Sequence, residues 1–228
     1  MHYRIHFVYP ALLAIALKAL GPSLTLSEFQ ASSGIRGETT ARDVLDYLVR
    51  KGIGQHSQSK YSFSKSDRMT LAILALQNGI DLETISRSLS WQDFEAFASS
   101  LLNLAGYVSE CNLYLSKPYR MQIDVIGVNH KSRLVVVVDC KHWKKCHLSS
   151  MLNHARKQAR RSLELLKCRL NIFQAVPIVL TLYPMNIKFI EGIPIVSVSE
   201  FNSFIQELPV SLYEINVLSK NTMPKFSF

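Results

Sequence analysis

The sequence lacks several features that would place it in a specialised class of proteins. Its 228 residues contain no low-complexity segment and no internal repeat, which excludes a repeat architecture. Its four cysteines include no Cys-x-x-Cys pair, and the spacing of Cys140, His142, Cys146 and His147 fits no standard structural zinc site. We therefore expect ordinary reduced cysteines in an intracellular, cytoplasmic protein.

The sequence also has no apolar run that suits a membrane span. Residues Phe7 to Leu20 are apolar apart from Lys18, but this stretch is too short to cross a bilayer. It also lacks the charged start and the cleavage site of a signal peptide. Pro10 near its beginning and Gly21 after its end predict a buried helix instead, so no membrane partner is expected.

Acidic residues are scarce relative to basic ones. The chain has 17 Asp and Glu against 26 Lys and Arg, with a pI near 9.4. Between Lys141 and Arg169 there are nine basic residues and a single acidic one, Glu164. Such a local excess favours an anionic partner such as DNA, although solubility alone would also account for a basic protein.

The most informative stretch runs from Gln122 to Trp143. Gln122–Val128 and Leu134–Lys141 have the composition of strands, and the polar residues 129–133 between them predict a turn. The run of four valines, 135–138, has no polar side, which is typical of a central strand buried on both faces. We expect a hairpin whose second strand lies inside a sheet.

Charged residues follow this valine run abruptly. Strand side chains alternate, so Asp139 and Lys141 should point to the same face, and Asp124 should approach Asp139 across the hairpin. Two carboxylates beside a lysine form an anionic oxygen site that suits Mg²⁺. The alternative is a buried Asp–Lys pair that only satisfies its own charges.

Asp124, followed after a gap by Asp139-x-Lys141, resembles the PD-(D/E)xK core of the restriction-endonuclease-like superfamily. The Mrr-type restriction endonucleases and the archaeal Holliday-junction resolvases look most similar, over roughly residues 91–208. Ile123 precedes the first carboxylate where proline is common, and the second carboxylate is an aspartate. The resemblance implies an α/β fold: a restriction-endonuclease-like mixed sheet with flanking helices.

The same resemblance implies a metal-dependent DNA endonuclease that hydrolyses phosphodiester bonds with Mg²⁺, for which Mn²⁺ would substitute. Asp124 and Asp139 would be the metal ligands, with the backbone carbonyl of Cys140 as a third. Lys141 would position the attacking water or stabilise the phosphate. Glu95 on the preceding helix would reach the metal, or else be a solvated surface glutamate.

The first half of the chain predicts a separate module. A helix from Pro10, a short helix capped by Thr25, a third helix opened by Thr40 and a hairpin within 53–63 resemble a winged helix-turn-helix. We therefore divide the chain into a winged-helix domain at 1–65, a helical linker at 66–90 and a nuclease-like domain at 91–228. The module would bind DNA or, alternatively, another protein.

Within 91–228, helices and strands alternate, which predicts a mixed sheet with helices on both faces. Trp91–Leu104 and Leu148–Leu170 have helical patterns, the second of them strongly basic. Apolar strands are expected at Val108–Leu115, Val176–Leu182 and Pro194–Val198.

Nine basic residues are candidates for DNA contact, on the third helix, the wing, the segment after the motif and the basic helix: Arg36, Arg42, Lys60, Lys144, Lys145, Arg156, Lys157, Arg160 and Arg161. Two alternatives stay open for the whole chain. One is a winged-helix DNA-binding regulator with a catalytically inactive nuclease-like domain, and the other is a structure-specific junction resolvase. A homodimer would suit cleavage of both strands.

Overall fold

The computed structural model describes residues 9–116, 120–143, 145–168, 172–210 and 212–220. The chain divides into two compact units, Met1–Asp93 and Phe94–Phe228, with the division inside the first turn of a helix. The helices predicted as a linker over 66–90 belong to the first unit. None of the helices in the described ranges is both long and apolar enough to cross a membrane.

The first unit consists of helices and a small antiparallel sheet of order β1-β3-β2. Its elements are α1 (Pro10–Ala19), β1 (Ser23–Thr25), α2 (Leu26–Ser33), α3 (Glu38–Arg50), β2 (Gln55–Ser57), β3 (Lys60–Ser62), α4 (Lys65–Gln77) and α5 (Leu82–Arg87). The core contains Leu13, Leu17, Phe29, Leu45 and Tyr61.

Capping residues set the helix starts of this unit. Thr25 and Glu28 form the predicted capping box of α2, with the Thr25 N–H donating to Glu28 Oε2 at 2.7 Å. The prediction that Thr40 opens the third helix is wrong, because α3 begins two residues earlier, after Gly37. Glu38 in its first turn suits the positive end of the helix dipole, so no capping side chain is required.

The second unit is a mixed α/β domain built on a seven-stranded sheet of order β4-β5-β6-β7-β9-β8, with β10 paired to β7. Its elements are α6 (Trp91–Leu104), β4 (Val108–Leu115), β5 (Met121–Asn129), β6 (Leu134–Lys141), α7 (Leu148–Cys168), β7 (Gln174–Thr181), β8 (Phe189–Ile190), β9 (Ile193–Ser197), α8 (Val198–Glu207), the 3-10 turn Leu212–Glu214 and β10 (Leu218–Ser219). The predicted mixed sheet is confirmed.

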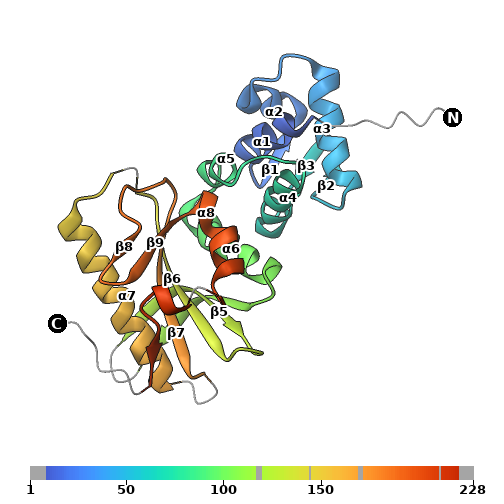
Figure 1. Cartoon of the computed structure of the whole chain (residues 1–228). Helices are drawn as coiled ribbons and strands as arrows, with labels where there is room; N and C mark the ends of the chain where they lie inside the picture. The colour runs from blue at the N-terminus through green and yellow to red at the C-terminus, as the bar shows by residue number, and fades with distance from the viewer. Residues whose placement is uncertain (1–8, 117–119, 144, 169–171, 211, 221–228) are drawn as a thin grey trace. The chain divides into compact units, whose positions relative to one another are not determined.

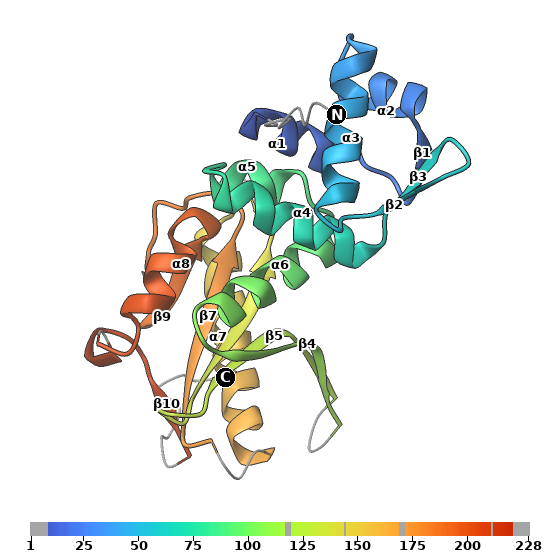
Figure 2. The ribbon, with the colours of Figure 1, turned by 90° about the vertical axis from the view of Figure 1, so that its right-hand side faces the viewer.

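Helices cover both faces of this sheet, as predicted. The long helix α7 lies along one face, and α6 and α8 lie on the other (Figures 1 and 2). On the α7 side, Ala155 and Ala159 pack in one apolar cluster with Ile126, Val135 and Val137. Strand β6 is buried from Leu134 to Cys140, so the valine run forms the predicted central strand.

The sheet changes direction at β6. Strands β4, β5 and β6 are antiparallel neighbours, whereas β6 and β7 are parallel and are joined through α7. The carboxyl ends of β6 and β7 therefore meet at the same edge, with Lys141 opposite Thr181. In sheets with parallel strands, that edge is where ligand sites form.

Strand β4 is interrupted at Asn112. Its pairing with β5 passes from Cys111–Val125 to Leu113–Ile123, and Asn112 between them has a φ of 56°, in the left-handed region. Its side-chain oxygen accepts a hydrogen bond from Gln122 Nε2 at 2.7 Å. The interruption lies opposite Asp124 of β5.

Candidate active site

The β5–β6 hairpin brings the two predicted carboxylates together. The antiparallel register pairs Val125 with Val138, so Asp124 and Asp139 occupy the next position along the ladder. The backbone N–H of Cys140 donates a hydrogen bond of 2.9 Å to Asp124 Oδ2. The predicted approach of the two aspartates is therefore present, and it follows from the hairpin alone.

Lys141 lies on the same face as Asp139, as strand alternation predicts. Its Nζ atom is 2.9 Å from Asp139 Oδ2. The Asp139 side chain is 1% exposed and the Lys141 side chain 15% exposed, so water screens this pair poorly. An ionised carboxylate in such a place requires cationic or hydrogen-bonding partners.

Helix α7 supplies further partners, which the motif did not reveal. Arg161 Nη1 donates to Asp139 Oδ1 at 2.7 Å, and His154 Nδ1 lies 3.7 Å from Asp139 Oδ2. Buried Gln158, between them on the helix, donates from Nε2 to the carbonyl of Val137 at 2.6 Å. One buried carboxylate thus faces three basic side chains from two elements.

The two aspartates have opposite pKa shifts. Burial, and then the negative charge of Asp139, raise the pKa of Asp124 above its ordinary value, against the hydrogen bond from Cys140. Burial alone would also raise the pKa of Asp139. The hydrogen bond from His154 and the charges of Lys141 and Arg161 outweigh it, so the pKa of Asp139 is lowered.

These shifts predict opposite stability changes for two matched variants. A raised folded-state pKa favours folding only while the group is protonated, so ionised Asp124 destabilises the fold as pH rises through that pKa. Asp139 stabilises the fold above its unfolded pKa, and this stabilisation is lost in acid. We expect Asp124→Asn to raise the melting temperature at pH 7 and Asp139→Asn to lower it.

The Asp124→Asn difference should shrink as pH falls toward about 4, where the unfolded aspartate becomes protonated, whereas the Asp139→Asn difference should shrink only below about 4, as pH falls through the lowered folded-state pKa. Thermal melts of the two variants and the wild type at several pH values measure this. Shifts of the same sign in both variants at pH 7 would contradict the assignment of opposite environments.

Glu95 lies on α6 and is 4% exposed, so the alternative of a solvated surface glutamate is wrong. Its charge acts on the neighbouring strands. Burial, and then the charges of Asp124, Asp139 and Glu95, hold the pKa of the Cys140 thiol well above its usual range. Cys140 is therefore an uncharged thiol, and its backbone is the part that can serve the site.

The predicted DNA-contacting residues have different surroundings. Arg36, Arg42 and Lys60 are exposed in the first unit, and Arg42 pairs with Glu38 at 2.8 Å. In the second unit Lys145, Lys157 and Arg160 are exposed, and Lys144 lies outside the described residues. Arg156 instead holds Glu191 through both Nε and Nη2, and Arg161 holds Asp139.

The side chains at the site allow one of the common ways of holding Mg²⁺. Across the described ranges, no three His, Cys, Asp or Glu side chains gather as a metal-binding group. Asp124 and Asp139 are nevertheless a pair of carboxylates that a cation would stabilise, since burial and then the charge of Asp139 raise the pKa of Asp124. Because Mg²⁺ is commonly held by one or two carboxylates with water and substrate phosphates, the residues fit that mode of binding.

Comparison with known proteins adds little to this geometry. No protein-family model matches the chain, and no curated protein sequence matches it. Among solved structures the chain is similar to protein VC1899 from Vibrio cholerae, with a TM-score of 0.41 and 14% sequence identity, over 90% of this chain and 50% of that one. The chain thus spans about half the length of that protein, and a likeness of this size carries no argument about activity.

Proposed function

We propose that the second unit is a metal-dependent DNA endonuclease of the restriction-endonuclease-like, PD-(D/E)xK type. The observation that carries this proposal is the meeting of Asp124 and Asp139 across a central hairpin, with Lys141 2.9 Å from Asp139. The parallel pairing of β6 and β7 supports the proposal, since Asp139 and Lys141 lie at the edge where the carboxyl ends of these two strands meet.

The residues have distinct roles in the proposed reaction. Asp124, Asp139 and the carbonyl of Cys140 would hold Mg²⁺, which supplies Lewis-acid stabilisation of the charge that develops on the phosphate. Lys141 would orient the attacking water or donate to a phosphate oxygen. Arg161 and His154 keep Asp139 ionised. Gln158, bound to the Val137 carbonyl, positions the helix that carries them.

The charges around Asp139 also suit an anionic substrate. Lys141 and Arg161 both contact the single carboxylate of Asp139, so its negative charge is offset and repels an entering phosphate less than a lone carboxylate would. Exposed Lys157 and Arg160 on the same helix would hold the DNA backbone without reading its sequence.

The decisive experiment is a cleavage assay on duplex, flap, junction and single-stranded DNA, with Mg²⁺, with Mn²⁺ and with a chelator. We expect cleavage of at least one form with either metal and none with the chelator. If the protein cuts no form with either metal, the domain is a catalytically inactive nuclease-like domain. Cleavage confined to junctions would select the resolvase alternative.

For the first unit we propose a winged helix-turn-helix that binds DNA through α3 and the β2–β3 wing. Three helices followed by a hairpin whose strand β3 pairs with β1 support this arrangement. Arg42 on α3 and Lys60 on β3 are exposed, as is Arg36, which precedes α3 and does not lie on the helix as predicted. A protein-binding role is the second candidate, because α3 also carries acidic side chains: Glu38 pairs with Arg42, and Asp46 accepts a hydrogen bond from the Tyr61 hydroxyl of β3.

A fragment of residues 1–93 separates these two roles. We expect it to melt cooperatively and to bind duplex DNA with an affinity that falls steeply with salt. Replacement of Arg36 and Lys60 by alanine should reduce the salt slope by roughly one per lost phosphate contact. A folded fragment with no DNA affinity at low salt would leave the protein-binding role.

A further inference from the structure

A cavity of about 660 Å³ lies at the edge of the second unit's sheet where β6 and β7 end. Residues 145–148 and Met151, from the segment that enters α7, form one wall, and residues 184–187, after β7, form the other. This volume is within the range of about 300–1,000 Å³ that is typical of small-ligand sites.

The cavity is adjacent to the proposed active site through α7. Met151 lies one helical turn before His154, which is 3.7 Å from Asp139. Trp143, which follows Lys141 by two residues, packs edge-on against the His154 ring with centroids 5.0 Å apart. The cavity and the side chains around Asp139 therefore share helix α7 and the carboxyl end of β6.

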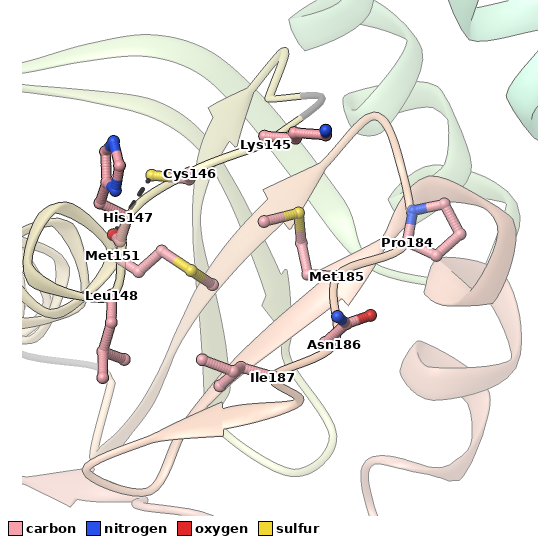
Figure 3. Close-up of a pocket in the computed structure, with 9 residues that line it drawn as sticks. All are labelled: Lys145, Cys146, His147, Leu148, Met151, Pro184, Met185, Asn186 and Ile187. Carbon is pink, nitrogen blue, oxygen red and sulfur yellow. Dashed lines mark hydrogen bonds between the residues drawn. The ribbon is translucent and has the colours of Figure 1, made fainter.

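The lining joins an apolar floor to a polar, cationic rim. Figure 3 shows the side chains of Met151, Met185 and Ile187 turned toward one another across the cavity. Met151 is 2% exposed, and Met185 and Ile187 are partly buried against the apolar core. Lys145, Asn186 and His147 are exposed at the rim.

This combination matches the chemistry of a nucleotide, which has an apolar face, a hydrogen-bonding edge and a negative phosphate. Methionine sulfur makes favourable contacts with aromatic rings, and flexible methionines adapt to different shapes. The ring faces of all bases are alike in this respect, so the floor would accept any base. Lys145 has the charge to hold the adjoining phosphate.

We propose that this cavity, defined as the Met151–Met185 pocket, binds one unpaired base next to the phosphate that is cut. The inference rests on the proposed nuclease function and names its substrate class, DNA with an unpaired nucleotide such as a flap or a bulge. A paired base must leave its stack to enter, whereas an unpaired base does so at little cost. The pocket thus selects DNA structure over sequence.

Binding is measured by fluorescence anisotropy without metal, on a duplex and on the same duplex with a single-nucleotide bulge. A 2-aminopurine at the bulge reports whether that base is taken up. We expect wild-type protein to bind the bulged DNA more tightly, with similar affinity for different bulged bases. Met185→Ala should weaken bulge binding about tenfold, which corresponds to about 1.4 kcal/mol, while duplex affinity stays unchanged.

Matched variants distinguish loss of binding in the pocket from a general loss of positive charge or of stability. Met185→Leu keeps the apolar volume and should retain most of the preference. Lys145→Ala should weaken binding of the bulged DNA, whereas Lys131→Ala, in the exposed turn at the opposite end of β6, should not. Thermal melts check that each variant is folded, and Lys145→Ala tests the pocket through an exposed residue if Met185→Ala does not fold.

The outcomes distinguish the pocket from the nuclease. Cleavage without any preference for unpaired bases, or an equal loss on both DNA forms in Met185→Ala, overturns the pocket and leaves the nuclease. Bulge binding through Met185 without Mg²⁺-dependent cleavage supports the pocket and overturns the nuclease. Failure to bind any DNA overturns both. A dimer that dissociates on Met185→Glu, with unchanged DNA affinity, would make the cavity a protein interface instead.

Discussion

Replacement of Asp139 by asparagine is expected to lower the rate of Mg²⁺-dependent DNA cleavage by roughly a hundredfold or more. Asparagine has nearly the same shape but no charge, so it would hold a cation poorly. DNA affinity measured without metal should stay the same or rise slightly, because a negative charge near the phosphate is removed. Single-turnover cleavage and metal-free anisotropy measure the two effects separately.

The variant must be assayed well below its melting temperature. Asp139 is 1% exposed and contacts both Lys141 and Arg161, so removal of its charge takes an anionic partner from two cations. Removal of one member of a buried ion pair costs about 3–5 kcal/mol, and the partial exposure of these cations makes that an upper bound. Folded Asp139→Asn protein that cuts as fast as wild type would remove this site from the reaction.

Lys141→Ala is expected to lower the cleavage rate by a comparable factor, roughly a hundredfold, through a different cause. Lys141 is not a proposed ligand, so binding of Mg²⁺ or Mn²⁺ should persist. In this variant Asp139 retains its contact with Arg161, whose Nη1 atom is 2.7 Å from Asp139 Oδ1, so the carboxylate stays ionised. In Lys141→Ala, measured on one preparation, the metal affinity should therefore be retained while the cleavage rate falls. In Asp139→Asn both the metal affinity and the cleavage rate should fall.

Lys131→Ala is the matched lysine control for this prediction, since Lys131 is exposed in the turn between β5 and β6. Its cleavage rate should equal that of the wild type. Loss of metal binding in Lys141→Ala would mean that the lysine organises the carboxylates and does not act on water or phosphate.

The sequence predicted those parts of the fold that depend on local pattern. The hairpin followed from the valine run and the polar turn, and strand alternation placed Asp139 and Lys141 on one face. Helix α6 and strand β4 have the predicted bounds. The short strands β1, β8 and β10 were not predicted, because two or three residues are too few to show the alternation of a strand. The equally short β2 and β3 were predicted from Gly54 and the polar turn between them, without such alternation.

The partners of Asp139 on α7 depend on tertiary packing. The positively charged residues of this helix were expected to face solvent, whereas Arg161 turns inward to Asp139 and Arg156 binds Glu191. The spacing of His154, Gln158 and Arg161, at i, i+4 and i+7, does mark one face of the helix. What the spacing cannot supply is the packing of that face on the carboxyl end of β6.

The left-handed residue in β4 has a consequence for association between molecules. In the described part of the sheet, β4 is an outer strand, with Val108 and Tyr114 exposed. A flat outer strand of this kind would recruit a strand from another copy and extend into an aggregate. The left-handed φ of Asn112 interrupts the regular strand geometry at mid-strand, which makes β4 a poorer template for edge pairing. The protein therefore carries protection against edge-to-edge growth beside the residues proposed for catalysis.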